Sequence, residues 1–171
     1  MRRNNYKLEG EPEGSPAVEW RMRTLQQRPG FLIRRLHQIH VALFAEECGG
    51  EGVTPVQYSV MTALDQLGAV EQIALGRAVG LDRANVAEVI LRLEQREWVE
   101  RSISVKDRRM KIATLTEKGR ALLDRVEALA ARAHERTIEA LAPAERKTLL
   151  KYLRLLVAAN NDISRSPMGL D

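Results

Sequence analysis

Basic side chains gather in one short window of the sequence. Between residues 101 and 111 a single acid, Asp107, stands among five bases: Arg101, Lys106, Arg108, Arg109 and Lys111. The window carries a charge of +4, which equals the net charge of the whole 171-residue chain. A local basic surface on an otherwise neutral chain is typical of a protein that binds a polyanion such as nucleic acid. A hairpin tip that is merely solvated is the simpler interpretation, and the charge pattern leaves it open.

A second set of polar side chains follows a helical spacing. Arg34, His37 and His40 stand at positions i, i+3 and i+6, so on a helix they form a row beside an apolar face. Cationic and imidazole donors next to an apolar wall suit an acid with an apolar body, such as an aromatic carboxylate or its thioester. A structural histidine and an arginine in an interface ion pair are the alternative. Three further side chains are expected to complete this effector pocket: Tyr58, Met61 and Trp20.

Cysteine usage and the absence of catalytic motifs limit the possible functions. Cys48 is the only cysteine, which excludes a disulfide within the chain and a cysteine-based metal site. Glu46 and Glu47 beside it should raise the pKa of its thiol, which disfavours a role as peroxide sensor without closing that alternative. The sequence contains no G-x-S-x-G motif, no phosphate-binding glycine loop and no cluster of metal ligands. We therefore expect no enzyme, no cofactor and no metal ion.

Composition indicates a helical protein. Apolar residues make up 44% of the chain but aromatic residues only 4%, which favours helices over sheets. No apolar run approaches the roughly 18 residues that span a membrane, and the first residues lack the apolar core of a secretory signal. We expect a mostly α protein of the α+β class, located in the cytoplasm and without a membrane partner.

Prolines, glycines and cap residues divide the chain into parts. A polar arm without periodicity covers residues 1–19, and a tail covers residues 166–171. The domain between them, 20–165, has terminal helices at 29–49 and 116–163 around a winged helix-turn-helix at 54–115. The apolar stripes of the terminal helices exceed what so small a core can cover. A two-fold homodimer would bury them.

Three details of this layout are specific predictions. The helix that begins at Pro29 should end in a left-handed cap at Gly49–Gly50. The helix after the capping box Thr54–Gln57 should turn these side chains inward: Val56, Val60, Met61 and Leu64. Strands at 98–104 and 111–115 should form the wing, with Ile112 facing the core.

The helix after Gly80 is the expected recognition helix. Asp82 should cap it, because a carboxylate accepts from the free N–H groups of a first turn. The side chains that point away from its buried face are Arg83, Ala84, Asn85, Ala87 and Glu88, with Arg92 one turn later. Arg83 and Asn85 are the best candidates for base contacts, because arginine suits guanine and asparagine suits adenine. Contact with the phosphate backbone, or with solvent alone, is the alternative.

The segment LDRANVAEVILRLEQREWVERSISVKDRRMKIATLTEKG resembles the MarR family of bacterial transcription regulators. The resemblance covers about residues 28–164 in element order, and its most specific parts are the wing tip and the start of the following helix. It implies a homodimer with interlocking terminal helices, recognition helices in successive major grooves and wings in flanking minor grooves. It also implies that Arg109 enters the minor groove and that Arg108 and Lys106 contact phosphates. We interpret Asp107 as a clamp on an arginine or on the tip backbone.

Three positions depart from the family pattern. Glu88 stands where many relatives carry a base, so it should either read a cytosine or pair with Arg92. Ala84 and Ala87 replace the usual serine or threonine, which leaves few polar contacts to DNA. Glu97 stands where glycine usually ends the recognition helix, so we expect a different cap there.

The stretch from Arg28 to His40 is similar to the MarR regulators of aromatic-acid breakdown. The sequence therefore predicts a sequence-specific DNA-binding transcription regulator, a repressor that an aromatic carboxylate or its coenzyme A thioester releases from operator DNA. An architectural winged-helix DNA-binding dimer that senses no ligand is the alternative. A winged helix used only for protein contacts is a further one.

Overall fold

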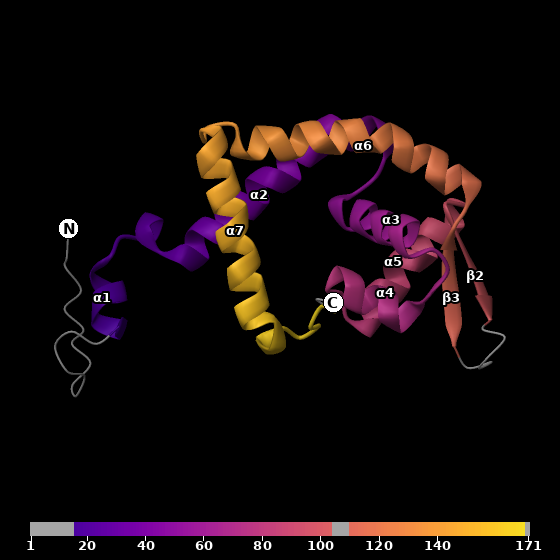
Figure 1. The fold of residues 1–171 in the computed structure, drawn as a ribbon, viewed down its shortest axis with the longest axis horizontal. Coiled ribbons are helices and arrows are strands. Elements are labelled where there is room, and N and C mark those ends of the chain that lie inside the picture. Colours follow the sequence, from indigo (N-terminus) through magenta and orange to yellow (C-terminus); the bar gives the residue numbers. More distant parts are fainter. Residues whose placement is uncertain (1–15, 104–109, 170–171) are drawn as a thin grey trace, which may run out of the picture. The chain divides into compact units, whose positions relative to one another are not determined.

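The computed structural model describes residues 16–103 and 110–169 of the chain. Residues up to Ile39 form one unit, and residues from His40 onward form a second. The first unit contains α1 (Pro16–Met22), the 3-10 turn η1 (Leu25–Gln27) and the beginning of α2 (Pro29–Cys48) (Figure 1). Residues 16–19, assigned above to an irregular arm, are therefore helical. The rest of that arm lies outside the described residues.

The second unit holds the helix-turn-helix, the wing and the last two helices. Its further elements are η2 (Gly49–Glu51), α3 (Pro55–Leu67), β1 (Val70–Glu71), α4 (Gln72–Val79), α5 (Arg83–Gln95), β2 (Val99–Ile103), β3 (Lys111–Leu115), α6 (Glu117–Ile138), α7 (Pro143–Asn160) and η3 (Asn161–Ile163). The strands form a small antiparallel sheet in the order β1-β3-β2. The predicted fold class, mostly α with a winged helix-turn-helix, is confirmed. Strand β1 is new, because two residues leave no readable pattern in a sequence. No helix in the described residues is long and apolar enough to cross a membrane.

Polar side chains cap three helices where the sequence predicts them. The hydroxyl of Thr54 accepts the N–H of Gln57 at 3.2 Å, while the Gln57 side chain accepts the N–H of Thr54 at 3.0 Å. Asp82 and Thr116 cap α5 and α6 in the same way, each through the backbone N–H three residues on, at 2.8 and 3.0 Å. These bonds satisfy N–H groups that the first turn of a helix leaves without partners.

Glycines with positive φ follow two of the helices. Gly68 ends α3 and Gly80 ends α4, each with φ 69°. The left-handed cap predicted at Gly49–Gly50 is wrong. Helix α2 stops at Cys48 and continues as the η2 turn, and the left-handed residue is Gly52, with φ 67°. The chain thus makes one tight 3-10 turn before it reverses.

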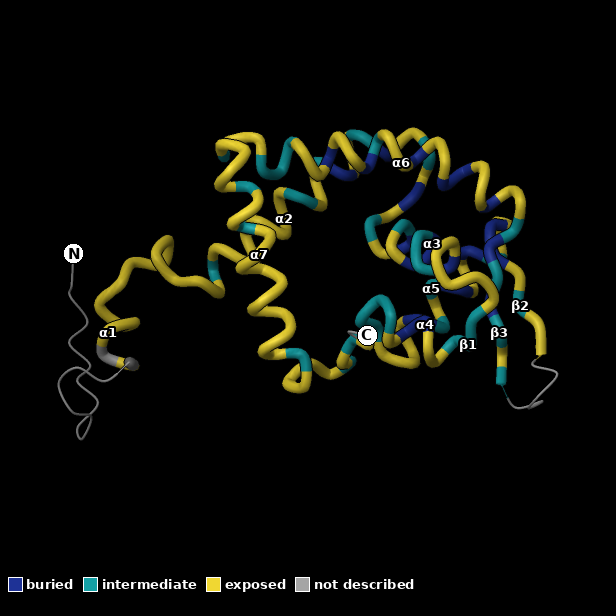
Figure 2. Tube along the Cα trace, in the orientation of Figure 1, coloured by how far each residue is buried: buried dark blue, intermediate teal, exposed yellow. Residues whose placement is uncertain are grey.

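The core of the second unit lies among α3, α5, the sheet and α6 (Figure 2). Its largest fully buried side chains include Phe44, Met61, Leu64, Leu75, Ile90 and Leu93. The inward position predicted for Val56 is wrong, since Val56 is 43% exposed. Gln57 faces the core instead, because its side chain folds back into the capping box.

The predicted face of strand β3 is also wrong. Ala113 and Leu115 are buried, whereas Ile112 is only half-buried on the opposite face. Leu115 pairs with the buried Val99 of β2, and this large apolar pair determines which face turns inward. Side chains alternate along a strand, so Ile112 then points outward.

The recognition helix α5 ends in a left-handed residue that is not glycine. Glu97 has φ 62°, the only positive φ of a non-glycine residue in the described chain. The N–H of Trp98 donates to the carbonyl of Leu93 at 3.0 Å, the six-to-one bond of a Schellman cap. The different cap predicted at Glu97 is therefore wrong, because Glu97 adopts the usual geometry at a conformational cost. A hydrogen bond from Lys118 lowers the pKa of the Glu97 carboxyl.

Helix α6 starts in direct contact with the end of α5, at a place we call the α5–α6 junction (Glu97, Trp98, Thr116 and Gly119). The N–H of Thr116 donates to the Trp98 carbonyl at 3.0 Å, and the Thr116 hydroxyl donates to the Glu97 carbonyl at 2.7 Å. A Cβ atom at Gly119 would lie 2.0 Å from the Trp98 carbonyl oxygen. The two backbones approach so closely that only glycine fits at this position.

The C-terminal tail returns to the helix-turn-helix. The Asn161 amide donates to the carbonyl of Met168 and accepts the N–H of the same residue, both at 2.9 Å. The N–H of Gly169 donates to the carbonyl of Arg77 in α4 at 3.1 Å. Met168 packs on Gly80, where a Cβ would lie 3.2 Å from the Met168 Cγ. The tail assigned to residues 166–171 is therefore held in place as far as Gly169.

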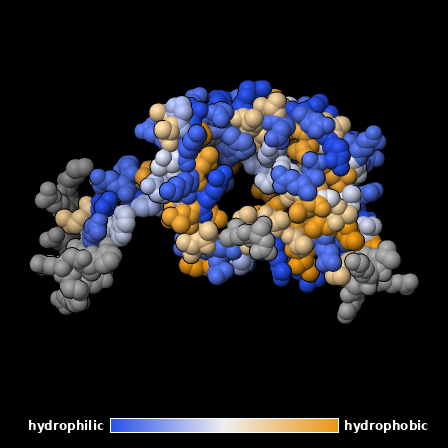
Figure 3. Space-filling model, viewed as in Figure 1, coloured by the Kyte–Doolittle hydropathy of each residue, from blue (hydrophilic) through white to orange (hydrophobic). Residues whose placement is uncertain are grey.

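Large apolar side chains remain exposed on the terminal helices. In the first unit α2 exposes Leu32, Ile33, Leu36 and Ile39. In the second unit α7 exposes Leu150, Leu153, Leu155, Leu156 and Val157, which contribute to the orange surface of that helix (Figure 3). Each of these side chains is 38% to 60% exposed. Contiguous apolar surfaces of this kind mark interaction sites.

Replacing Gly119 by alanine tests the α5–α6 junction. Gly119→Ala should lower the free energy of unfolding by about 3 kcal/mol, because the new Cβ overlaps the Trp98 carbonyl and nothing flexible can move aside. Urea unfolding followed by circular dichroism measures the loss. Gly30→Ala is the matched control, since a Cβ at Gly30 meets no atom within 4 Å. Equal stability of the two variants would contradict the close approach.

Replacing Glu97 tests the strained cap. Glu97→Gly should raise the free energy of unfolding by about 1 kcal/mol, because glycine adopts positive φ without a steric cost. Glu97→Ala loses the same ion pair with Lys118 but keeps the strain, so it should bring no gain. If the alanine variant is as stable as the glycine variant in the same unfolding measurement, the positive φ at Glu97 carries no conformational cost.

Candidate functional site

The exposed start of α5 presents few polar side chains. Arg83, Ala84 and Asn85 are exposed as predicted, whereas Ala87 is half-buried and faces less solvent than the sequence suggests. The Asn85 amide donates to the Asp82 carboxylate at 2.8 Å, and the Asn85 backbone N–H donates to the same carboxylate at 2.8 Å. Asp82 therefore both caps the helix and orients Asn85. One N–H and the amide oxygen of Asn85 stay available for a base edge.

The acidic side chain on this helix is already paired. Glu88 accepts a hydrogen bond from Arg92 one turn later, on the exposed face of α5. This arrangement agrees with one of the two roles expected for Glu88 and reduces its repulsion of DNA. It also occupies Arg92, which is less available to a phosphate while the pair persists.

The wing is joined to the recognition helix by an ion pair. Arg101 on β2 bonds to Glu94 of α5, and the Arg101 side chain is only 24% exposed. Strands β2 and β3 pair from Val99↔Leu115 to Ile103↔Lys111. The predicted tip contacts, Lys106, Asp107, Arg108 and Arg109, lie outside the described residues.

Aromatic and polar side chains from α2, α3 and α6 meet in what we call the histidine–tyrosine cluster: His40, Phe44, Tyr58, Glu127, His134 and Thr137. The His40 ring stacks on the His134 ring, with centroids 5.2 Å apart and planes inclined by 10°. His40 Nδ1 lies 2.9 Å from the hydroxyl oxygen of Thr137. Phe44 contacts both the His40 ring and the Tyr58 ring. The cluster offers hydrogen-bond donors beside flat aromatic faces.

Tyr58 acts as a donor in this cluster. Its hydroxyl donates to the Glu127 carboxylate at 2.9 Å. Burial, and then the hydrogen bond and charge of Glu127, raise the pKa of Tyr58 to about 12. The phenol therefore keeps its proton at any physiological pH. Among the residues the structure describes, no group of three or more acidic, histidine or cysteine side chains is placed to hold a metal ion.

The effector residues predicted from sequence are distributed between the two units. His40 and Tyr58 meet in the cluster, while Met61 is fully buried in the core of the same unit. Arg34 and His37 lie on the exposed first part of α2. In the first unit the Arg34 guanidinium lies 5.4 Å from the Phe31 ring, and that of Arg23 lies 4.7 Å from the Trp20 ring.

Sequence reasoning missed the three cluster residues on α6. Glu127, His134 and Thr137 share one face of the helix with the buried Ala130, at a spacing that a helical pattern can reveal. Nothing in the sequence, however, places that face against His40, because His40 and His134 lie more than half of the chain apart.

Ion pairs hold the end of α2 against α6. Glu47 accepts from Arg132 and from Arg136, each at 2.8 Å, and Arg136 also bonds to Glu46 at 2.9 Å. The hydrogen bonds from Arg132 and Arg136 lower the pKa of the Glu47 carboxyl. These contacts fix the position of the histidine–tyrosine cluster one to two turns away.

The same contacts decide the chemistry of Cys48. The thiol is fully buried, and burial, with the charge of Glu47 as a second cause, raises its pKa. A peroxide sensor needs an accessible thiolate, so this arrangement removes support from that alternative.

Known proteins resemble the chain in sequence and in structure. A model of the MarR family matches residues 53–111. The HTH-type transcriptional repressor NicR of Pseudomonas putida is 32% identical over 136 residues, which is 80% of this chain and 86% of the relative. BpsR of Bordetella bronchiseptica, whose DNA binding is regulated by 6-hydroxynicotinic acid, is 34% identical with a TM-score of 0.75, over 78% of this chain and 96% of the other. PcaV of Streptomyces coelicolor, solved with its natural ligand, is 31% identical with a TM-score of 0.75, over 80% and 96%.

Asn85→Ala tests how α5 reads bases. The variant should lose about tenfold of its preference for its target DNA over random DNA, because one base-edge contact disappears, while its affinity for random DNA stays unchanged. Competition binding with labelled DNA from the upstream region of its own gene measures both quantities. The Asp82 cap persists through the backbone N–H, so circular dichroism should show an intact fold. An unchanged preference would exclude Asn85 from base reading.

Proposed function

The chain belongs to the MarR family and is a DNA-binding transcriptional regulator, and we propose that it represses its target genes until an aromatic carboxylic acid releases it from DNA. It regulates transcription and is not an enzyme. The observation that carries the ligand part of the proposal is the histidine–tyrosine cluster, with its donors beside aromatic rings. The identity to NicR, a repressor, and to BpsR, which answers to 6-hydroxynicotinic acid, supports both parts.

A second copy of the chain is the partner we propose for the terminal helices. The exposed leucines of α7 and the apolar positions on the first part of α2 would lose contact with water in a symmetric dimer. Two copies would place two α5 helices for successive major grooves, with Arg83 and Asn85 toward base edges. Lys106, Arg108 and Arg109 of each wing would meet phosphates and the narrow minor groove, where negative potential is concentrated.

The chemistry of the cluster fits an aromatic acid. The exposed imidazole of His134 is a group that can bond a carboxylate, and the His40 ring stacked on it is held by the Thr137 hydroxyl. The exposed ring of His134 provides a flat surface for an aromatic body. The carboxylate of the ligand should lie on the histidine side, because Glu127 occupies the Tyr58 side with a negative charge. The sequence adds four further candidates for effector binding, which we keep as proposals: Arg34, His37, Trp20 and Met61.

The location of the cluster suggests how binding changes DNA affinity. It joins α2 and α3 to α6, and the α5–α6 junction joins α6 to the recognition helix. A ligand that separates His134 from His40 would move α6, and α5 would have to follow. A ligand shifts this equilibrium only by its preference for one arrangement over the other.

Two finer questions stay within the proposal. The effector is either the free acid or its coenzyme A thioester, and the alternative protein is an architectural dimer that answers to neither. An architectural dimer would bind DNA with equal affinity in the presence and in the absence of any acid.

Titration of bound DNA with candidate ligands tests the proposal. Free 6-hydroxynicotinic acid, benzoic acids and their coenzyme A thioesters are added to the protein on its own upstream DNA, and release is followed by fluorescence anisotropy. At least one acid should release the DNA. His134→Ala should raise the acid concentration for half release about tenfold, the effect of losing one charge-assisted hydrogen bond.

A second test compares two tyrosine-to-phenylalanine variants, one inside the cluster and one outside it as the control. Tyr58→Phe removes a hydroxyl from the cluster and should also weaken the response, whereas Tyr152→Phe removes an exposed hydroxyl from α7 and should not. If no acid or thioester releases DNA, the sensing proposal fails. If His134→Ala and Tyr58→Phe both release DNA at the same acid concentration as the wild-type protein, the effector binds elsewhere.

A further inference from the structure

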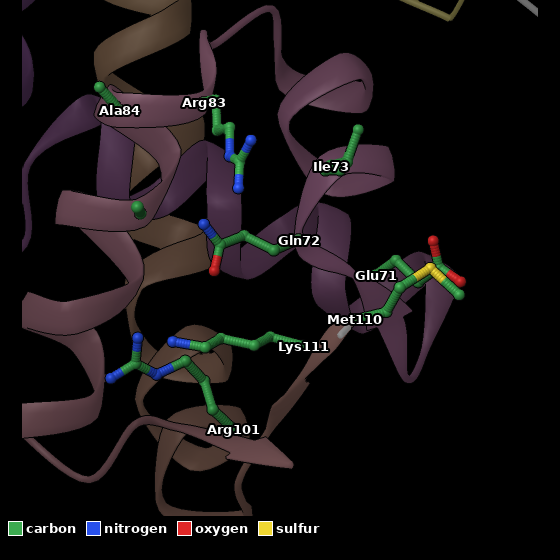
Figure 4. A pocket seen from close by; sticks show the side chains of 9 residues that line it. Glu71, Gln72, Ile73, Arg83, Ala84, Arg101, Met110 and Lys111 are labelled. Carbon is green, nitrogen blue, oxygen red and sulfur yellow. The ribbon is translucent and has the colours of Figure 1, made fainter. Parts of the chain in front are cut away.

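A pocket of about 540 Å³ opens between the starts of α4 and α5 and the base of the wing (Figure 4). Its polar lining is cationic, with Arg83 from α5, Arg101 from β2 and Lys111 from β3, and Gln72 from α4 beside them. Figure 4 shows the head groups of Gln72, Arg101 and Lys111 directed into the same space, with Arg83 above them. Glu71 also lines the pocket, but its carboxylate points away from these groups toward the rim.

The sheet register explains why two of these cations share one face. Arg101 pairs with Ala113, and Lys111 lies two residues from Ala113 along the same strand. Side chains alternate along a strand, so both cations lie on the face that Ala113 turns toward the core. This inner face is apolar near α6 and becomes cationic toward the tip.

Two of the three cations of the pocket have no ion-pair partner among the residues that the structure describes. Arg101 has a partner in Glu94, which fixes its direction and leaves other guanidinium N–H groups available. Arg83 and Lys111 make no ion pair within the described residues, and both are exposed. Three cations around one space repel each other unless an anion enters. The pocket therefore suits an anionic group.

We propose that this pocket binds one phosphate group of the DNA backbone. The inference rests on the DNA-binding function, and it adds Gln72, Arg101 and Lys111 to the contacts derived from the sequence. Arg83 and Ala84 belong both to the pocket and to the exposed start of α5. A DNA strand that borders the groove read by α5 would therefore pass the mouth of the pocket. Arginine forks and an amide match phosphate oxygens, and such contacts fix the register of a protein on DNA without reading sequence.

Lys111→Gln tests the phosphate contact without disturbing the fold, because Lys111 is exposed and unpaired within the described residues. DNA binding is measured between 50 and 200 mM salt for the protein's upstream DNA and for random DNA. The slope of log affinity against log salt should become shallower by about 0.9 for each bound copy of the chain. The loss of affinity should be equal for both DNAs. Lys147→Gln on α7, where the lysine is exposed and makes no ion pair within the described residues, removes the same charge and should leave the slope unchanged.

Single methylphosphonate substitutions along the upstream DNA identify the phosphate. One substitution in each half-site should weaken the wild-type protein more than it weakens Lys111→Gln, because Lys111 makes part of the contact that the substitution removes. An unchanged salt slope in Lys111→Gln overturns the inference while DNA binding itself stands. A loss confined to the upstream DNA would mean base reading and overturns it too. A loss of acid response without a change in salt slope would assign the pocket to the effector. Failure of the wild-type protein to bind either DNA would overturn the DNA-binding function as well.

Discussion

The close contact between the backbone of Gly119 and the carbonyl of Trp98 is the constraint that fixes the recognition helix α5 and the wing relative to α6. It brings four elements together, since α5 ends, β2 begins, β3 ends and α6 begins within a few residues of that point. The hydroxyl of Thr116 completes the arrangement, because it caps α6 and also bonds to the end of α5. Packed interiors pass on displacements rather than absorb them. The recognition helix, the wing and the long helix must therefore move together.

That coupling gives the separate sites a common physical basis. The histidine–tyrosine cluster uses α6, the cationic pocket uses the base of the wing, and the base reading that we propose would use the start of α5. Affinity and specificity are divided unequally among them. The recognition helix has two alanines and a neutralised glutamate at positions that commonly face DNA. In the function we propose, most electrostatic attraction would then come from the wing and its base, and discrimination would rest on very few side chains.

Much of the fold could be predicted from the sequence, because its signals are local. The caps at Thr54, Asp82 and Thr116 each depend on residues three positions apart, and all three are confirmed. Errors arose where distant residues decide a local outcome. Ile112 has a larger apolar side chain than Ala113, so a local pattern turns Ile112 inward. The pairing of Leu115 with Val99 instead determines that the face of Ala113 is buried. Glu97 was expected to change a cap, yet the junction enforces left-handed geometry on whichever residue stands there.

The sites followed the same division. The row of Arg34, His37 and His40 could be read from spacing on one helix, whereas the partner His134 requires knowledge of how α2 meets α6. Two cations of the pocket, Arg101 and Lys111, are visible in the sequence as part of a charge run, but only the strand register shows that they share a face. Tertiary packing, which a single sequence does not encode in any short pattern, supplies this information.

The burial of Cys48 has a practical consequence of its own. It is the only thiol in the chain, and it is closed off in the core with its pKa raised. Alkylating reagents attack the thiolate, so they reach this atom only when the packing around α2, α3 and α6 opens. The rate at which Cys48 is alkylated therefore reports how often the core around it opens. A cysteine introduced on the surface would therefore react with a fluorophore without competition from Cys48. Distances could be measured with such a label without first replacing Cys48.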